Sequence, residues 1–518
     1  MKACATAAIA TAVLAGWMTR GNAVAVHAQS RLDPIMYTVR FAPDARAMDV
    51  DATFPARGRA SLELMLPIWS PGFYRIENYA TRVQQIAART IAGAPLDVHP
   101  ATSNRWTVMT GGSASVTVSY RVAAAERSVT TNWVSADYAV LNGAPTFITL
   151  AGEFERPHDV RVVLPPSWTK SMTGLDRAPD GEPNHYLAAD YDALVDSPIV
   201  AGNPSVQEFD IAGSHHVVVE IGEPGAVAAF DGPRAAIDLR KIVEAQSRLW
   251  GGLPFKTYDF LLVFRPGGGG LEHRNSMLAT SQAASTQTPA AYMRWLNFIS
   301  HEYCHAFNVK RLRPIELGPF DYEHEAHTTG LWISEGFTSY YGNLAVTRAG
   351  RSSGDDFLAS MSAQIRQLQN SPGRLRQTLE QSSADVWTSE SVSGVNTNAE
   401  TSVSYYGKGQ VVGFLLDARV RRSTGGSQSL DDVMRLALQR YGGGRGFTAE
   451  EFQRTASSVA GADLSAWFAR AVASTDELEY EDALDWYGLR FAAGTWTLEA
   501  RPDATAIQRT RLSALFAQ

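Results

Sequence analysis

Alternating apolar and polar residues make the first part of the chain β-rich. Apolar side chains recur at every second position in the segments 36–41, 61–66 and 115–122. Turn-forming sequences separate such runs, for example Ser-Pro-Gly at 70–72. Short alternating runs bounded by Gly and Pro are typical of antiparallel sheets. The pattern therefore predicts an all-β domain, a sandwich or a saddle, over residues 32–210.

The pattern changes about 20 residues further on. Apolar residues recur with the helical period over 234–250, and a continuous apolar run at 258–264 then predicts a buried strand. Helical periodicity dominates the long stretch 292–472. We therefore expect a second, mainly helical domain over 230–475, followed by a C-terminal tail at 476–518.

The size and charge of the chain narrow the possible functions. With 518 residues, 45% of them hydrophobic and 19% charged, the chain has the composition of a globular protein of about two to four domains. Its formal net charge of −7 gives no electrostatic reason to expect nucleic acid as a partner. Peptides and small ligands remain possible, and the sequence does not indicate an oligomeric state.

The N-terminus predicts a secretory signal peptide. Lys2 precedes an apolar, alanine-rich stretch at 3–17, and small residues lead to a cleavage site after Ala28. We therefore expect residues 1–28 to be removed during export across the inner membrane, to the periplasm or the outside. No later segment has the 18 or so apolar residues of a membrane span, so none is expected in the mature chain.

The sequence His-Glu-Tyr-Cys-His at 301–305 indicates a metal site. In a helix predicted over 292–310, His301 and His305 lie at positions i and i+4, so both imidazoles can bind one cation. Glu302 stands beside the first histidine and would act as general base on a metal-activated water. The Gly and third His that continue the metzincin motif are absent.

A third protein ligand distinguishes a metal site from a chance match. Glu325 and His324 have the spacing of thermolysin-like and aminopeptidase-like sites, but the surrounding segment 320–327 has the polar composition of an exposed loop. Glu335 lies further along, alone in an apolar segment, 331–341, that predicts a helix. A buried carboxylate is costly unless it is paired or binds a metal, and this context favours Glu335.

Three segments resemble the glycyl aminopeptidase family of gluzincin metallopeptidases. They are HEYCHAFNVKRLRP at 301–314, LWISEGFTSYY at 331–341 and LPIWSPGFY at 66–74, within a resemblance that extends over about 35–490. The resemblance implies a multidomain α+β fold, with an N-terminal β-domain before a thermolysin-like, mainly helical catalytic domain. It implies zinc aminopeptidase activity on small N-terminal residues, and it supports Glu335 as the third ligand.

Two further motifs imply how a peptide would be bound and cleaved. The segment Gly268–His273 resembles the Gly-x-Met-Glu-Asn motif of related aminopeptidases, in which the carboxylate binds the free α-amine of the substrate. Glu272 would take that role, while Gly269 and Gly270 would let the peptide backbone approach a strand edge. The segment 405–409 resembles their Tyr-x-Lys-Gly motif.

That second resemblance assigns stabilisation of the oxyanion to Tyr406, with Tyr405 as the other possible donor. The mature chain would retain one cysteine, Cys304, which lies within the metal motif. Neither the spacing nor the resemblance requires it as a ligand, and we interpret it as a small packing residue.

Family members usually continue into a PDZ-like domain, whereas the tail at 476–518 lacks the sequence of a complete one.

Together these features predict a zinc-dependent aminopeptidase that acts on peptides. One Zn²⁺ per chain would be held by His301, His305 and Glu335, with Glu302 as base. Two alternatives remain. One is a zinc endopeptidase on the same scaffold, and the other is a non-catalytic peptide-binding or chaperone-like protein. The physiological substrate is not indicated by the sequence.

Overall fold

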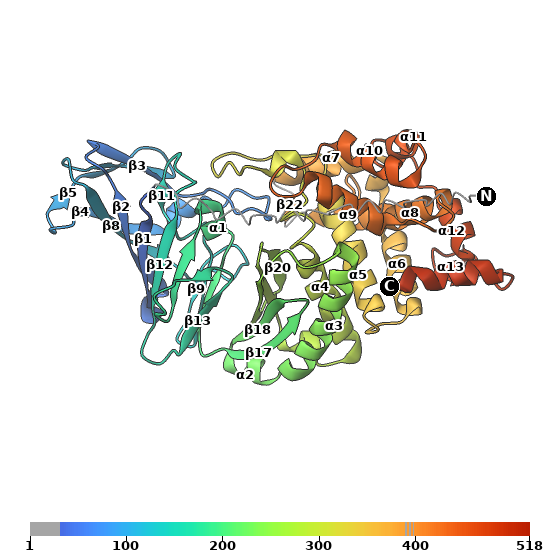
Figure 1. Cartoon of the computed structure of the whole chain (residues 1–518), viewed down its shortest axis with the longest axis horizontal. Coiled ribbons are helices and arrows are strands. Elements are labelled where there is room, and N and C mark those ends of the chain that lie inside the picture. Colours follow the sequence, from blue (N-terminus) through green and yellow to red (C-terminus); the bar gives the residue numbers. More distant parts are fainter. Residues whose placement is uncertain (1–31, 389–390, 393–394, 397, 518) are drawn as a thin grey trace, which may run out of the picture.

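The computed structural model describes residues 32–517, apart from 389–390, 393–394 and 397. The predicted signal peptide lies outside these residues. Within them, no helix has both the length and the apolarity that crossing a bilayer requires. Figure 1 shows a β-rich N-terminal part beside a helical C-terminal part, which confirms the fold class predicted from the sequence.

The N-terminal domain is built on an eight-stranded sheet. Its strand order is β14-β15-β12-β1-β2-β8-β4-β5, antiparallel except for the parallel β1–β12 pair. Its strands are β1 (Ile35–Ala42), β2 (Ala47–Pro55), β4 (Val83–Thr90), β5 (Pro95–Leu96), β8 (Ser115–Ala123), β12 (His158–Val163), β14 (Asp176–Arg177) and β15 (His185–Ala188). The predicted strands at 36–41 and 115–122 are confirmed as β1 and β8.

Two four-stranded sheets accompany the large sheet. One has the order β11-β3-β7-β6 and the other β13-β16-β10-β9. Their strands are β3 (Ser61–Met65), β6 (Val98–Pro100), β7 (Arg105–Met109), β9 (Trp133–Val134), β10 (Tyr138–Leu141), β11 (Thr149–Leu150), β13 (Lys170–Thr173) and β16 (Ile199–Gly202). Alternate side chains such as Val39, Val50, Leu64 and Leu141 share one buried core, as the period-2 pattern requires.

A third layer connects this domain to the helices. Five strands with the order β17-β18-β19-β21-β20 form it: β17 (Ser205–Ile211), β18 (Ser214–Gly222), β19 (Thr257–Phe264), β20 (Gly269–Glu272) and β21 (Ser276–Ser281). One face, with Val219 and Leu261, packs on Tyr138 and Val140 of the β10 sheet. The predicted boundary at residue 210 lies within β17, and the division of the chain into domains stays a prediction.

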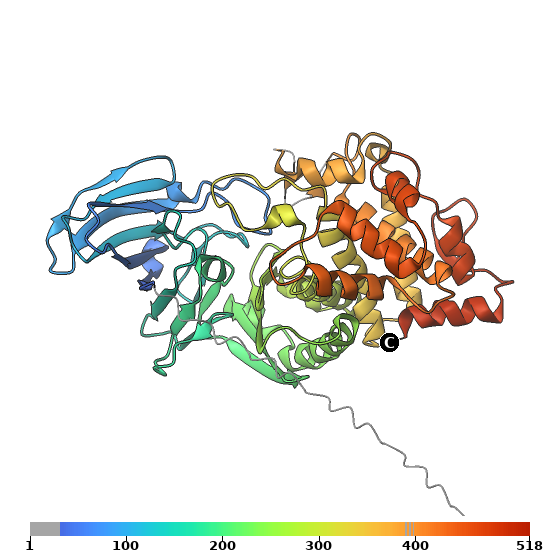
Figure 2. The same ribbon diagram turned by 45° about the horizontal axis from the view of Figure 1, so that its top comes forward.

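Helices cover the other face of this sheet. Figures 1 and 2 show them on the side away from the β-domain, where Phe260 and Leu262 pack against Leu239 and Trp295. Helix α1 (Tyr191–Val195) belongs to the β-domain core. The helices that follow it along the chain are α2 (Pro224–Ala228), α3 (Gly232–Trp250), α4 (Pro289–Cys304), the π-helix η5 (Trp332–Phe337), α5 (Thr338–Arg348), α6 (Gly354–Gln369), α7 (Leu379–Ala384), α8 (Tyr405–Ser423), α9 (Leu430–Tyr441), α10 (Ala449–Ala460), α11 (Ser465–Ala471), α12 (Glu481–Tyr487) and α13 (Ala506–Phe516).

Two short hairpins complete the described chain. They are β22 (Ser391–Val392) with β23 (Val395–Asn396), and β24 (Leu489–Phe491) with β25 (Leu498–Ala500). The second hairpin stands between α12 and α13 in the predicted C-terminal tail. Leu489, Leu498 and Leu515 of this tail join the large core of the helical part.

Candidate active site

Helix α4 presents the first two residues of the metal motif. Thr288 caps its N-terminus by accepting a hydrogen bond from the Ala291 amide, and its apolar face packs into the core of the helical part. The predicted extension of this helix to residue 310 is wrong, because the helix ends at Cys304 and His305 is its C-terminal cap. The chain then turns, with the amide of Lys310 donating to the His305 carbonyl.

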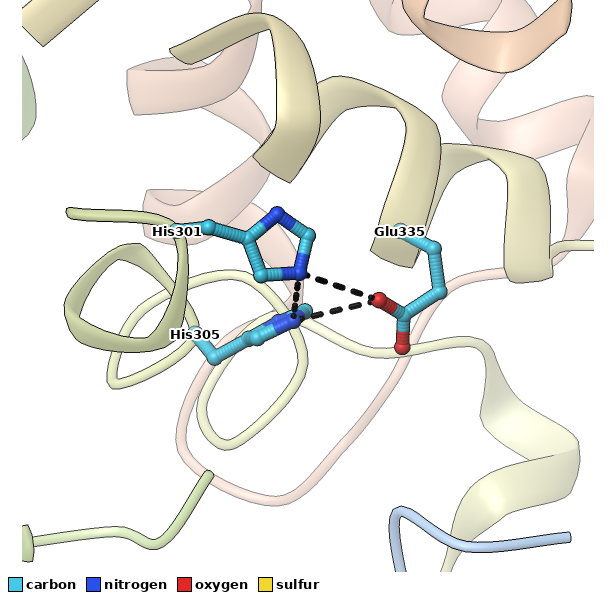
Figure 3. Close-up of side chains that lie close together, drawn as sticks. All are labelled: His301, His305 and Glu335. Carbon is cyan, nitrogen blue, oxygen red and sulfur yellow. Dashed lines mark hydrogen bonds and ion pairs between the residues drawn. The ribbon is translucent and has the colours of Figure 1, made fainter. Parts of the chain in front are cut away.

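Three side chains converge at the end of α4 (Figure 3). The Nε2 atoms of His301 and His305 lie 3.0 Å apart. The Oε2 atom of Glu335, from η5, lies 3.1 Å from Nε2 of His305 and 3.5 Å from Nε2 of His301. The structure thus joins the i, i+4 histidine pair to the carboxylate from the apolar segment, as the sequence predicted.

This triangle fits a bound metal ion. Ligands about 2.0–2.1 Å from a tetrahedral Zn²⁺ are separated by about 3.3 Å, close to the distances between these three atoms. Glu335 is 2% exposed, and its Oε2 faces the Nε2 atoms of both histidines. A buried carboxylate is costly unless it is paired or binds a metal, and a cation at the centre of the triangle would be bound by all three groups.

The Nδ1 atoms of both histidines, which point away from the triangle, also have polar partners. Nδ1 of His305 lies 2.8 Å from the carbonyl oxygen of Asn308, and Nδ1 of His301 lies 3.3 Å from Oγ of Ser339. A proton on Nδ1 of His305 leaves the lone pair of its Nε2 directed toward Glu335. Such outer contacts fix the tautomer and the ring orientation of metal-binding histidines.

The charges at the centre of the site are strongly coupled. Burial alone would raise the pKa of Glu335, but His305 and His301 hold it well below its usual range. Burial opposes a charge on His305 as well, yet the Glu335 carboxylate raises the pKa of His305 to about 10. The pocket therefore favours positive charge beside Glu335, as expected where a cation binds.

Asn308 positions the segment that carries Glu335, a role that the sequence analysis did not assign. It is fully buried, and its Nδ2 donates to the carbonyl oxygens of Ile333 (2.8 Å) and Ser334 (3.2 Å). Both carbonyls belong to η5, and π-helices are frequent at functional sites. Asn308 lies inside the segment 301–314 singled out above, but no spacing rule shows which residue binds the later helix.

The proposed base lies at the wall of a cavity of about 630 Å³. Glu302 is 6% exposed and lies against Gly270 of strand β20, where a Cβ atom would overlap its carboxylate. Burial raises the pKa of Glu302 to about 8, and Glu272 and Glu335 add to the shift. A carboxyl whose pKa lies near neutrality suits proton transfer in both directions, and a bound cation lowers that pKa.

Strand β20 forms one side of the cavity and has a free edge. It is the last strand of its sheet and pairs only with β21. Gly269, Gly270 and Glu272, all named from the sequence, line the cavity together with the metal-binding triangle. The free edge can therefore accept an extended peptide as an added strand.

Glu272 is held from both domains. Nζ of Lys310 lies 3.8 Å from Oε1 of Glu272 and 2.9 Å from Oδ1 of Asp196, which follows helix α1 of the β-domain. Gly72, also from the β-domain, packs so closely that a Cβ atom there would lie 2.6 Å from Glu272 Oε1. Residues of the β-domain thus border the Glu272 end of the cavity, and a further cavity of about 530 Å³, lined by Gly72, Glu272, Asp196 and Lys310 among others, lies beyond it.

Both predicted tyrosines line the same cavity. The ring of Tyr406 stacks near His301, with centroids 6.1 Å apart, and also stacks on Tyr405. Tyr405 is 2% exposed, and its hydroxyl has no hydrogen-bond partner among the described residues. Burial raises the pKa of both hydroxyls well above the usual range, so both remain protonated donors.

The alternative ligands do not reach the site. Glu325 lies 3.0 Å from Nε2 of His327 and His324 lies 2.8 Å from Asp321, all in the exposed loop predicted from the sequence. Cys304 is completely buried, and burial raises the pKa of its thiol to about 12. A protonated thiol is a poor metal ligand, and Cys304 packs in the core as expected.

Comparison with known proteins agrees with this geometry. Residues 36–203 match the model of the peptidase M61 N-terminal domain, and residues 294–412 match that of the M61 glycyl aminopeptidase. An aminopeptidase N family protein from Idiomarina loihiensis has a similar structure, with 28% identity, a TM-score of 0.82 and coverage of 88% of this chain and 78% of that one. Among curated proteins, none matches.

Two more distant structures share the fold. Yeast LTA4 hydrolase in complex with bestatin has a TM-score of 0.52 at 14% identity, over 88% of this chain and 70% of that one. A variant M1 zinc metallopeptidase from Deinococcus radiodurans, bound to a Tyr-Ser-Ala substrate, has the same score and identity, over 86% and 95%. At this identity the likeness establishes the fold alone.

Proposed function

This chain belongs to the M61 peptidase family and is a metallopeptidase, and from that premise we propose that it is a zinc-dependent aminopeptidase. The observation that carries the proposal is the position of Glu272. This buried carboxylate lies on the free strand edge that also borders Glu302, and it faces the cavity of the metal-binding triangle. A peptide bound along β20 would therefore have its N-terminus at a fixed distance from the reacting groups.

Glu272 would bind the α-ammonium group of the substrate. A carboxylate with an ammonium partner forms a strong, charge-assisted hydrogen bond. Gly72 packs against Glu272 and Nζ of Lys310 lies 3.8 Å from its Oε1, so this buried carboxylate is fixed at the end of the active-site cavity. A fixed carboxylate at this end of the cavity supports removal of a terminal residue over cleavage within a chain.

Proton transfer would be the task of Glu302. Its position against Gly270, beside the metal-binding triangle, allows it to take a proton from water and to pass it to the leaving amine. Zn²⁺ held by His301, His305 and Glu335 would supply Lewis acidity to the water and the carbonyl group. Tyr406 would donate a hydrogen bond to the carbonyl oxygen as negative charge develops on it.

The preference for an N-terminal Gly is supported by the name of the matching family model, and its extension to Ala rests on the family resemblance of the sequence. Export to the periplasm or the outside rests on the sequence of residues 1–28. The residue preference and the export are therefore both parts of the proposed function. Peptides are the substrates that a metallopeptidase implies.

The decisive experiment joins a metal assay to hydrolysis of Gly-, Ala- and Leu-arylamides, with and without chelator. We expect one zinc per chain, loss of activity with chelator and recovery with Zn²⁺. Glu302→Gln should keep the metal but lower kcat about 10²- to 10⁴-fold. Glu499→Gln, in an exposed ion pair with Arg490, is the control. Normal turnover by Glu302→Gln would rule out the mechanism.

Glu272→Gln separates an aminopeptidase from an endopeptidase. The variant should lose most of its activity on peptides with a free amine, because the ammonium group loses its charged partner. An endopeptidase would cleave N-acetylated peptides, and its activity would hardly change with this substitution. A non-catalytic binding protein would bind peptides without turnover in either form.

A further inference from the structure

A second cavity, of about 430 Å³, adjoins the active-site cavity on the β-domain side. Strands β9 and β10 supply Trp133 and Tyr138 to its wall, and two arginines, Arg46 and Arg127, also line it. The guanidinium carbon of Arg127 lies 4.4 Å from the centre of the Trp133 ring, and that of Arg46 lies 5.8 Å away. Two cationic groups are thus held against one buried aromatic ring.

Several hydrogen-bond donors at and beside this cavity have no partner within the described part of the chain. The indole Nε1 of Trp133 and the hydroxyl of Tyr138 are buried, and neither forms a hydrogen bond with the described residues. Arg265 lies beside Tyr138 and is 2% exposed, and its Nε and Nη1 atoms are also without partners among those residues. Buried donors in this state are costly, and an anion in the cavity would satisfy those of Trp133 and Tyr138, which line it.

The carboxylates near the cavity leave a positive balance. Glu223 lines it and lies 3.2 Å from Nη2 of Arg127, which leaves the other guanidinium N–H groups of Arg127 available. Asp137 also lines it but is exposed. No carboxylate of the described residues lies within 4.0 Å of the Arg46 or Arg265 guanidinium. Two arginines and two carboxylates line the cavity itself, and Arg265, buried beside Tyr138 of its wall, adds a third positive charge.

Arg127 connects this cavity to the active site. It lines both cavities, and the next residues, Ser128 and Val129, form the active-site wall. A Cβ atom at Gly269 would lie 3.7 Å from Cγ1 of Val129, so this wall faces the start of β20. The buried Arg265 holds the wall by donating from Nη2 to the Ser128 carbonyl at 3.1 Å.

The direction of β20 relates this arrangement to a bound peptide. The strand runs from Gly269 to Glu272, and Glu272 stands at the amine end in the proposed function. An extended peptide on this edge would have its C-terminal end toward Gly269 and the 127–129 wall. Because an extended peptide rises about 3.3 Å per residue, as the strand does, the four residues of β20 lie beside about four substrate residues.

We propose that the arginine-lined cavity binds the C-terminal carboxylate of a short peptide, so that the substrates are peptides of about three to five residues with both ends free. This inference rests on the proposed aminopeptidase function. The shared chemistry is that of a carboxylate or another small anion. Arg127, which lines both cavities, donates hydrogen bonds to the terminal carboxylate. Arg46, Trp133 and Tyr138 supply the other hydrogen-bond donors of the site.

The test compares di- to pentaglycine as free acids and as C-terminal amides. For the best length we expect kcat/KM to be about tenfold higher for the acid, the size of a charge-assisted hydrogen bond. Arg46→Gln should reduce this acid-to-amide ratio toward one. Arg511→Gln is the matched control, because Arg511 also stacks on a buried tryptophan, Trp486, in the C-terminal helices. It should keep the wild-type ratio.

Three results would overturn the inference. Equal kcat/KM for acids and amides in the wild-type protein would show that no terminal carboxylate is recognised. An unchanged ratio in both Arg46→Gln and Arg127→Gln would place recognition elsewhere. Acetate or phosphate that inhibits cleavage of acids and amides equally would indicate a site for free anions. Failure to cleave any peptide would instead reject the proposed function itself.

Discussion

Gly270 lies directly against Glu302: a Cβ atom at position 270 would overlap the Oε1 and Cδ atoms of the carboxylate. The backbone of Gly270 has no unusual torsion that only glycine allows, so its lack of a side chain is a matter of space. Gly270→Ala should therefore fold, but Glu302 must move away from its position beside the metal-binding triangle. We expect kcat to fall about 100-fold, since small displacements of a catalytic group have effects of this size.

The control for this substitution is Gly225→Ala. Gly225 lies in helix α2, and a Cβ atom there would meet no atom within 4 Å. The two variants should have similar unfolding temperatures, and only Gly270→Ala should lose turnover. Full activity in Gly270→Ala would show that Glu302 does not act from this position.

Asn308→Ala tests whether the link to the π-helix positions Glu335. The substitution leaves the carbonyl oxygens of Ile333 and Ser334 without their buried donor. We expect the free energy of unfolding to fall by about 1–3 kcal/mol. Zinc affinity should weaken about 10- to 100-fold, as is usual for residues that orient metal ligands, and competition with a chelator measures it.

Asn203→Ala serves as the comparison for Asn308→Ala. Asn203 also donates from Nδ2 to a backbone carbonyl, that of Ser167, but it is exposed. Its loss should leave zinc affinity unchanged. If Asn308→Ala lost stability but kept wild-type zinc affinity, the asparagine would support the fold without positioning Glu335.

The sequence could predict that the three candidate metal ligands lie together because their signals are local. The i, i+4 spacing brings His301 and His305 together on any helix. The apolar residues around Glu335 distinguish it, as a candidate ligand, from Glu325 in its polar segment. The end of α4 at Cys304 could not be predicted, because no Gly or Pro marks it. It is accompanied by contacts between the following turn and a segment 25 residues later, as the Asn308 hydrogen bonds show.

The contacts between the β-rich part and the helical part of the chain could not be predicted from the sequence either. The Lys310–Asp196 pair joins residues 114 positions apart, and the position of Gly72 against Glu272 depends on how two sheets pack. Periodicity identifies which side chains are buried, but it does not show which sheet they face. For this reason the place of β17 and β18 in the sheet could be identified only from the pairing of β17 with β18 and of β18 with β19.

Acid should destabilise the helical part through His216. This histidine is fully buried beside the Tyr303 hydroxyl, at 3.0 Å, and near His215 and Asp210. Burial lowers the pKa of His216 to about 4. The folded state therefore holds the neutral ring, and this stabilisation is complete above the ordinary pKa of about 6.5 and is lost as pH falls toward 4.

The measurement is the free energy of unfolding of metal-free wild-type protein and His216→Gln between pH 7 and pH 4. The difference between them should shift in favour of the variant by up to about 3 kcal/mol over this range. His99→Gln, at an exposed position, should show no such shift. A difference that is constant with pH would contradict a buried neutral His216.

Tyr406 and Tyr405 both reach the cavity, and substitution by Phe separates their roles. Tyr406 stacks near His301, whereas Tyr405 is more deeply buried. Tyr406→Phe should lower kcat about 10²- to 10³-fold while KM and zinc content stay near wild type, because the hydroxyl acts only as charge develops. Tyr405→Phe should change kcat less than tenfold, since its ring packing is kept. The opposite order of the two effects would assign the oxyanion contact to Tyr405, and equally small effects would leave the carbonyl oxygen to the metal alone.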